Sequence, residues 1–540
     1  MAAPVLRPLK IAIDDVNDSP QNAPISPVAA MEDLSLSPTL QHDDDIADYD
    51  LASASKLIPL SMTDSASGER PLPSLQLPLM FRDLPFVGLF GLHLILTVLA
   101  TGNIRADDER KEERRDIVSG LRDTDKNLNL EDDADIGVAL RSLCVVNVLF
   151  ALGWLLLFIF YSKLRFVQGS CIFSVVGLTA LSVMLFLVDS SFAMFWGIIC
   201  AGVVVLDLVW YIRSNGLDFV AVFFELVVEV LTTHPALGYA TIAVLVTYTV
   251  WSSWICTTIG YVGQDVPPWS LSMFYLIFHV YWMSNIFKNI ITIVVSGTTM
   301  IWYCCNESTD SDNGFSQVDE NEQAPQDPST KNLDRKVVLH YVRCAISSSF
   351  GSICIGSLLC PIAHLLWTAL RWARRDESAL LRRFISLRSE RVEHFIRTYH
   401  KFSFVHIAAY NKPYYVAAHD AWELIEQHGV EAIVDDDLTS RILLLGGNGW
   451  AGIMSALVAS ALAGASSHAI FFTLAAFTLC YTTMSLATQA IAAVIKTLFV
   501  CFAENPGRLS QLQPLIYHRF VRLAELKSFR DHKVPSTMRA

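Results

Sequence analysis

The stretch Ser142–Phe160 reads SLCVVNVLFALGWLLLFIF and contains no charged side chain. A membrane-spanning α-helix needs about 20 mostly apolar residues, because lipid offers the backbone no hydrogen-bond partners. The stretch therefore predicts a membrane-spanning helix. Outward from it, residues 138–303 carry only 11 charged side chains in 166 positions. Lipid is thus the expected solvent for much of the chain.

The whole composition agrees with a membrane protein. Of 540 residues, 52% are hydrophobic and 17% are charged, whereas soluble domains are about a quarter charged. The net charge of −13, without any basic stripe, argues against a nucleic-acid-binding protein. Most cysteines lie within apolar runs, which argues against a secreted disulfide-bonded protein. We expect an all-α integral membrane protein.

Apolar runs of sufficient length predict ten transmembrane helices, with the run 269–303 also compatible with two short segments. The ten lie at about 84–102, 138–161, 169–188, 192–212, 217–233, 236–260, 269–303, 340–372, 440–464 and 468–501.

Three parts of the chain follow from this pattern. Residues 1–80 carry 12 acids against 4 bases and are rich in Ser and Pro, which predicts a disordered acidic tail in the cytosol. Residues 81–510 form the transmembrane domain, and 511–540 are a cytosolic C-terminal tail.

The basic residues predict orientation, because Lys and Arg near span ends favour the cytosolic side. The loop 373–438 is expected in the cytosol, since residues 371–401 hold nine bases against four acids. This stretch is either a helix lying on anionic inner-leaflet lipids or a cytosolic helix packed on the ends of the spans.

Two acidic loops are expected on the opposite side of the membrane. Residues 103–137 hold 12 acids against 7 bases, and 304–336 hold 8 against 3. The second loop contains a sequon at Asn306, which is a candidate glycosylation site.

Motifs typical of nucleotide-binding proteins, hydrolases and zinc proteins do not occur in the chain. It has no GxxxxGK[ST], no HExxH, no GxSxG and no cysteine–histidine spacing suited to zinc. We expect no enzymatic activity, no nucleotide hydrolysis and no cofactor.

Ionisable residues within predicted spans are costly unless they face a cavity or a partner. Glu225 and Glu229 are four residues apart, so they share one helix face. They either line a pathway for a cation or pair with Lys288 and polar groups on neighbouring helices.

Aromatic residues are dense between Tyr239 and Tyr303. Aromatic faces attract quaternary ammonium groups, and Tyr248, Trp251 and Trp282 lie deepest in the predicted spans. The alternative is that these residues belong to interfacial belts.

The segment Ser347–Ser357, SSSFGSICIGS, opens a span that later contains Pro361. Its small residues permit close helix packing, and the alternative is a hinge or a substrate-contacting break.

With these motifs identified, the sequence resembles the choline transporter-like family, and more closely its fungal and plant "pH nine-sensitive" branch. The resemblance rests on the Tyr281–Tyr303 span, on GSICIGSL at 351–358, on Ala408–Lys412 with Ala421–Ile425, and on FVCFAENP at 499–506. It covers roughly residues 80–510.

Two residues depart from the family pattern, with Asn411 where Gly is expected and Asn505 where Asp is usual. The resemblance implies ten helices with both termini in the cytosol, and residence in the plasma membrane or, alternatively, an endomembrane. It also implies that the Gly-Ser and Tyr-Trp spans contact substrate.

Together these observations predict a transporter of choline or a related small organic cation, working by facilitated diffusion or exchange. The candidate substrate-binding residues are Trp282, Tyr281, Tyr248, Trp251, Glu225, Glu229, Asn285 and Ser352. The alternative is a non-transporting membrane scaffold involved in lipid or protein trafficking, supported by the acidic tail and the basic loop.

Overall fold

The computed structural model describes residues 81–99, 127–187, 217–265, 271–305, 328–375, 389–427, 439–463 and 469–522, with a few positions between 194 and 209. Within these ranges the regular elements are all helical, and none is a strand. The all-α prediction is confirmed. The predicted acidic tail 1–80, most of the run 192–212 and Asn306 lie outside the described residues.

Five helices contain a stretch long and apolar enough to cross a membrane. They are α3 (Asn127–Phe160), α4 (Lys163–Leu187), α7 (Pro235–Asp265), α8 (Leu271–Cys305) and α10 (Phe350–Arg375). A sixth candidate is the pair α18 (Ala469–Ala487) and α19 (Gln489–Glu504), bent by 53° at Thr488. Two shorter apolar helices are Leu84–Leu99 and Gly449–Ala461, the latter within α17 (Gly449–Ala463).

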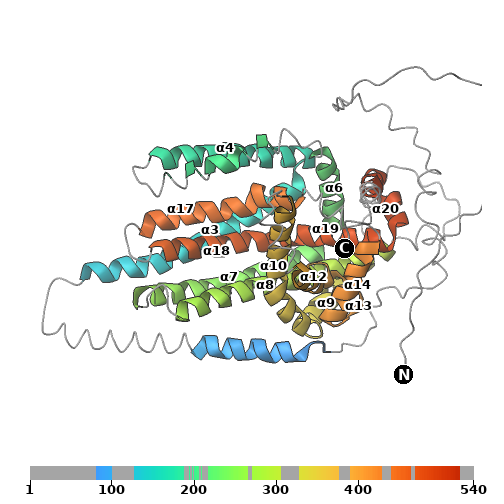
Figure 1. Ribbon diagram of the computed structural model, residues 1–540, viewed down its shortest axis with the longest axis horizontal. Helices are drawn as coiled ribbons and strands as arrows, with labels where there is room; N and C mark the ends of the chain where they lie inside the picture. The colour runs from blue at the N-terminus through green and yellow to red at the C-terminus, as the bar shows by residue number, and fades with distance from the viewer. Residues whose placement is uncertain are drawn as a thin grey trace, which may run out of the picture. The chain divides into compact units, whose positions relative to one another are not determined.

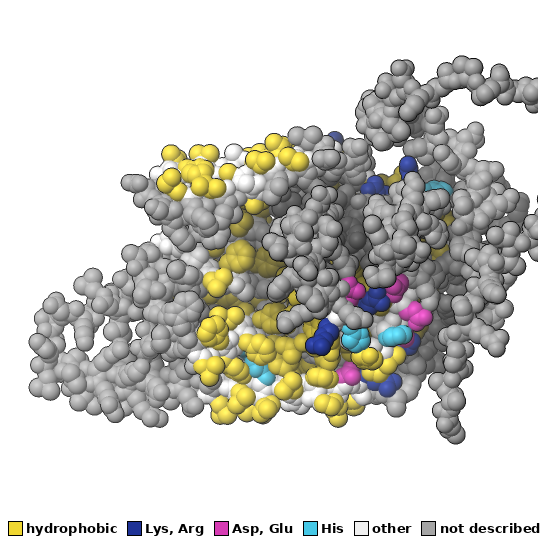
Figure 2. All heavy atoms as spheres, viewed as in Figure 1, with side chains coloured by type: hydrophobic (Ala, Val, Ile, Leu, Met, Phe, Trp, Pro, Cys, Tyr) yellow, Lys and Arg dark blue, Asp and Glu magenta, His cyan; other side chains and the backbone are white. Residues whose placement is uncertain are grey.

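The spans form a bundle that presents apolar side chains outward. In Figure 1, α3, α4, α7, α17 and α18 run in roughly one direction, and α18 packs against α17, α3 and α7. Figure 2 shows hydrophobic side chains over this part, while charged side chains gather toward α9 and α12–α14. Leu149 in α3 and Met184 in α4 are exposed, as side chains facing lipid would be.

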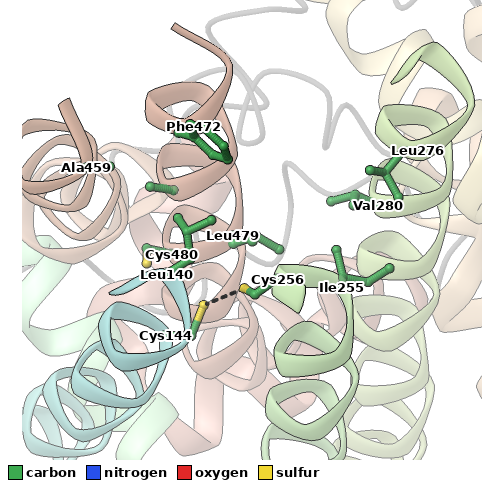
Figure 3. Packing of buried hydrophobic residues seen from close by; sticks show 11 residues of the cluster. Leu140, Cys144, Ile255, Cys256, Leu276, Val280, Ala459, Phe472, Leu479 and Cys480 are labelled. Carbon is green, nitrogen blue, oxygen red and sulfur yellow. Dashed lines mark hydrogen bonds between the residues drawn. The ribbon is translucent and has the colours of Figure 1, made fainter. Parts of the chain in front are cut away.

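A buried hydrophobic cluster is shared by five helices of the bundle, α3, α7, α8, α17 and α18 (Figure 3). Cys144 of α3 contacts Cys256 of α7, with 3.8 Å between the sulfur atoms, and Leu479 and Cys480 of α18 pack beside them. All four are buried. Asn147 of α3 donates to the Cys480 carbonyl oxygen at 2.7 Å. None of the ten cysteines whose side chains the structure describes forms a disulfide, and seven of the ten are buried.

The run 269–303 forms the single helix α8 rather than two segments. The helix α19 lies along it in the same direction. The Gln489 amide donates to Thr292 at 2.8 Å, the Thr497 hydroxyl to Ser296 at 2.9 Å, and the Tyr303 hydroxyl to the Asn505 carbonyl oxygen at 2.7 Å. The two helices therefore end at the same end of the bundle.

The same end of the bundle also holds part of the loop 373–438. Tyr410, in the predicted cytosolic loop, donates to the Glu504 carboxylate at 2.9 Å. The end of α8, the end of α19 and the loop helices thus meet on one side. The orientation predicted from the basic residues separates the start of 304–336 from the C-terminal tail and from 373–438, whereas these contacts bring the three segments to one end of the bundle.

The prediction of a span at 217–233 is not supported by α6 (Leu217–Thr233). This helix has 17 residues, and in Figure 1 it runs across the direction of the spans. Its apolar face is buried, with Phe223 against Phe499 of α19 and Phe224 against Phe158 of α3. Glu225 and Glu229 share the opposite, exposed face. A one-sided helix of this kind covers the ends of spans rather than facing lipid all round.

The predicted run 340–372 is interrupted by a turn at 347–349. Before it, α9 (Pro328–Ile346) packs against α8, where the Tyr341 ring lies directly on Gly297. After it, α10 begins at Phe350 and continues through Pro361. Although α10 has the length and composition of a span, Figure 1 shows it crossing the direction of the others.

The loop 373–438 contains three helices, α12 (Ser389–Thr398), α13 (Ser403–Tyr410) and α14 (Tyr414–Gln427). The helix α12 packs against α10 and α14, with Ile396 buried. For its residues this favours a helix packed on the ends of other helices over one lying on lipid.

The remaining described helices complete the last third of the chain. A short helix α16 (Thr439–Leu443) and the π-helix η4 (Leu444–Asn448) lead into α17. After α19 the chain continues as α20 (Pro506–Leu512) and a helix over 514–522.

Candidate functional site

The aromatic pair Tyr281 and Trp282 lies where α8 crosses α10. The Tyr281 hydroxyl donates to the Leu358 carbonyl oxygen at 2.8 Å, and the Trp282 indole N–H donates to the Cys354 carbonyl oxygen at 3.0 Å. Trp282 is buried, and its ring packs edge-on against Phe90 of the helix Leu84–Leu99. The polar groups of both side chains are therefore occupied by the α10 backbone.

The second predicted pair, Tyr248 and Trp251, lies on α7. The Tyr248 hydroxyl is hydrogen-bonded to Thr482 of α18 and lies 3.5 Å from the Ser284 hydroxyl of α8. The rings of Tyr248 and Trp251 lie 5.3 Å apart, centroid to centroid. The structure thus anchors Tyr248 between three helices and leaves Trp251 pointing toward α8.

A buried histidine pair joins these aromatic groups. His93 of the helix Leu84–Leu99 lies against His279 of α8, with 3.0 Å between His93 Nε2 and His279 Nδ1. The Tyr275 hydroxyl is 2.9 Å from His93 Nδ1, and Thr97 Oγ1 is 3.3 Å from His279 Nδ1. Both histidines are buried. A polar chain therefore runs through an otherwise apolar contact between two helices.

The histidines link the two predicted aromatic pairs into one cluster. The His93 ring lies 5.0 Å from the Trp282 ring, and the His279 ring lies 5.6 Å from the Trp251 ring. We call the set His93, Tyr248, Trp251, Tyr275, His279 and Trp282 the aromatic–histidine cluster. It spans the helix Leu84–Leu99, α7 and α8, and it is the candidate site.

Other predicted site residues serve local structure. The Asn285 amide donates to the Tyr281 carbonyl oxygen one turn earlier. The Ser352 hydroxyl donates to the Asp83 carboxylate. Glu225 and Glu229 are exposed on α6, and Lys288 lies 5.8 Å from the Tyr481 ring centroid. None of these contacts reaches the aromatic–histidine cluster.

The Gly-Ser segment at the start of α10 is a close-packing surface. A side chain on Gly351 would overlap the carbonyl oxygens of Arg82 and Asp83, and one on Gly356 would overlap the rings of Phe404 and Tyr414. The Asn289 amide donates to the Ser357 hydroxyl at 2.9 Å. Of the two interpretations left open by the sequence, these contacts favour helix packing.

The two residues that depart from the family pattern are explained by their local geometry. Asn411 has φ 49°, a left-handed conformation that favours Gly and tolerates Asn better than most residues. Asn505 is the N-cap of α20, and its side chain accepts from the Arg508 backbone N–H. Asp and Asn are about equally good at such a position.

Comparison with known proteins identifies the family. Residues 196–507, more than half of the chain, match the profile described as "Plasma-membrane choline transporter". The chain belongs to the choline transporter-like family. The matched region includes α6 to α19 and so most of the cluster, although His93 lies before it.

Individual relatives are distant. The chain is 26% identical to Protein pns1 of Aspergillus fumigatus over 46% of its length, and 27% identical to Protein PNS1 of Saccharomyces cerevisiae over 44%. It is 23% identical to a CTL-like protein of Dictyostelium discoideum over 61% of its length. These matches cover 45%, 43% and 56% of the relatives, so the chain spans about half the length of the curated relatives it matches.

Sequence reasoning missed the role of the histidines. His93 and His279 are 186 positions apart, so no spacing rule joins them. The available signal was a single histidine within each of two apolar helices. In the part of the chain that the structure describes, no group of three or more His, Cys, Asp or Glu could hold a metal ion.

Proposed function

We propose that this protein transports choline or a related small organic cation, by facilitated diffusion or exchange and without nucleotide hydrolysis or other catalysis. Membership in the choline transporter-like family supports the class of substrate. The PNS1 names of the fungal relatives state neither a substrate nor a mechanism.

The observation that carries the proposal is the buried aromatic–histidine cluster between three membrane helices. Rings of Trp251, Trp282 and Tyr248 gather there, and their π-faces attract an ammonium group that has lost its water. The carboxylates of Glu225 and Glu229 are exposed on α6 and do not belong to the cluster. In this proposal the aromatic faces, rather than a carboxylate, compensate the charge of the cation.

The test is uptake of radiolabelled choline into proteoliposomes that contain the purified protein, with and without a pH gradient. Saturable uptake above that of empty liposomes is expected, and dependence on the gradient would show coupling to protons, with exchange indicated if an outward proton gradient drives uptake. The absence of saturable uptake of choline and of other small quaternary amines by folded protein would contradict the proposal. It would favour the scaffold alternative.

We also propose a topology with both termini in the cytosol and eight crossings rather than ten. Removing α6 and α10 from the predicted crossings brings 304–336 to the cytosolic side. This agrees with the shared end of α8 and α19 and keeps the basic loop inside. Residence in the plasma membrane is part of the proposal, and microscopy of a tagged chain would distinguish it from an endomembrane.

A further inference from the structure

Five aromatic side chains in or beside the cluster carry a hydroxyl or an indole N–H, and four of these groups are bonded to the protein, among them the Tyr275 hydroxyl beside His93. Tyr281 and Trp282 donate to carbonyl oxygens of α10, and Tyr248 is bonded to Thr482. The exception is Trp251, whose buried indole nitrogen has no hydrogen-bond partner among the described residues. Trp251 therefore presents a free N–H donor inside the bundle.

A second unsatisfied atom belongs to the neighbouring ring of His279. His279 uses Nδ1 toward His93, while its Nε2 is buried and has no partner among the described residues. The Trp251 and His279 rings lie 5.6 Å apart, and His279 is fully buried. Buried polar atoms are nearly always hydrogen-bonded to protein or to ordered water, so unpaired atoms on two neighbouring rings call for a hydrogen-bonding group from outside the chain.

The hydrogen bonds that connect His279 to His93 and Tyr275 determine whether His279 Nε2 is a donor or an acceptor. If the Tyr275 hydroxyl donates to the His93 carbonyl oxygen, His93 Nδ1 donates to Tyr275 and His279 Nδ1 donates to His93 Nε2. His279 Nε2 is then an acceptor. If Tyr275 instead donates to His93 Nδ1, both histidines switch tautomer and His279 Nε2 becomes a donor.

A hydroxyl group suits both states. It accepts from the Trp251 N–H and either donates to, or accepts from, His279 Nε2. An ammonium N–H cannot satisfy the Trp251 donor. A carboxylate can accept from both nitrogens only in the second state, and its burial next to neutral imidazoles would carry a large desolvation cost.

We propose that Trp251 Nε1 and His279 Nε2 bind the hydroxyl of an amino-alcohol cation, while neighbouring aromatic faces hold its ammonium group. This inference rests on the proposed function and narrows the substrate class to hydroxylated amines. It assigns Trp251 two tasks, since its ring faces the cation and its N–H selects the hydroxyl.

The experiment measures binding separately from transport. Thermal stabilisation of the detergent-purified full chain is titrated with choline, with n-propyltrimethylammonium, which replaces the hydroxyl by a methyl group, and with glycine betaine. The same ligands compete for choline uptake in proteoliposomes. We expect the wild-type protein to prefer choline over each analogue by about ten-fold or more, because a buried donor is left unpaired without the hydroxyl.

The variant Trp251→Phe keeps an aromatic ring and removes the N–H. In this variant the ratio of the affinities for choline and n-propyltrimethylammonium should be close to one, mainly because the affinity for choline decreases. The matched control is Trp282→Phe, whose N–H bonds to the Cys354 carbonyl oxygen. It should change the affinities for both cations by the same factor and leave their ratio intact.

The outcomes separate the inference from the proposed function. A wild-type protein that does not distinguish the two cations, or a Trp251→Phe variant with an unchanged ratio, would overturn the hydroxyl site even if choline is transported. Hydroxyl-selective binding without uptake would retain the site and reject transport. A preference for glycine betaine would indicate that the two nitrogens bind a carboxylate and not a hydroxyl, and it would also overturn the inference.

Discussion

At the residue scale, glycine decides how closely the start of α10 approaches its neighbours. The chain at Arg82 and Asp83 passes directly over Gly351, and the Arg82 backbone N–H donates to the Ser348 carbonyl oxygen at 2.9 Å. Asp83 has φ 51° and accepts from both Ser352 and the Tyr414 backbone N–H. This contact ties the first apolar helix to α10 and α14.

We therefore expect Gly351→Ala to destabilise the protein, because the new Cβ would collide with backbone rather than with a mobile side chain. A cost of about 1–3 kcal/mol is typical of such overpacking. The control is Gly153→Ala in α3, where no atom lies within 4 Å of the added Cβ. Thermal unfolding of the two purified variants gives the comparison, and equal melting temperatures would contradict the close contact.

A second prediction concerns His406 of α13. Burial lowers the pKa of His406 to about 4, with Lys412 adding to the effect. Its Nε2 is 3.8 Å from the Glu504 carboxylate, and neither ring nitrogen has a hydrogen-bond partner among the described residues. Burial likewise lowers the pKa of His400 to about 4. Asp420 favours the charged form of His406, but less strongly.

In the unfolded chain these histidines bind protons below about pH 6.5, whereas in the folded chain they do so only near pH 4. The free energy of unfolding is therefore highest above pH 6.5 and decreases as the pH is lowered from 6.5 to 4. The loss is on the order of 1 kcal/mol per pH unit for each histidine. His406→Phe should reduce the drop in melting temperature between pH 7 and pH 5. His419→Gln, at an exposed position, should not. An undiminished drop in His406→Phe would reject the assignment.

At the element scale, α6 is a 17-residue helix whose apolar face is buried by other helices. Phe223 and Phe224 are buried against α19 and α3, while Glu225 and Glu229 share the exposed face. Their separation of four residues correctly indicated a common face. It did not indicate whether that face meets solvent or a cavity.

Placing α6 across the ends of the spans reverses the expectation for its carboxylates. If they lined the pathway, Glu225→Gln and Glu229→Gln would abolish uptake. From the structure we expect the double variant to retain choline uptake and its saturation behaviour, because neither carboxylate belongs to the aromatic–histidine cluster. Uptake in proteoliposomes is the measurement, with Trp251→Phe as the variant that should differ. Loss of uptake in a folded double variant would restore the carboxylates to the pathway.

At the scale of the whole molecule, the hydrogen bonds between helix ends determine which loops share a side of the membrane. Tyr303 bonds to Asn505, and Glu504 bonds to Tyr410. Since α8 and α19 run side by side and end together, Asn306 directly follows an end that also starts the C-terminal tail. The charge of the loop 304–336 alone does not show this.

We predict that Asn306 is not glycosylated and that it lies on the same side as the C-terminal tail. Endoglycosidase treatment of the expressed protein should produce no change in mobility attributable to Asn306, as judged against Asn306→Gln. A sequon introduced into the loop 103–137 provides the positive control for the opposite side. A glycan on Asn306 together with a cytosolic C-terminus would contradict the shared helix ends.

The sequence by itself determined the class of this protein, because transfer of a long uncharged stretch into lipid depends on composition alone. It likewise identified the family, since the Gly-Ser, Tyr-Trp and terminal motifs are read residue by residue.

Only the tertiary structure decided which side chains meet. His93 and His279 lie 186 positions apart, and their contact depends on how two helices pack. The tertiary structure also showed that the apolar face of 217–233 packs on other helices. The sequence could not show this, because an apolar face is buried equally well by lipid or by other helices. Hydropathy measures the transfer free energy from water and does not distinguish these two apolar surroundings.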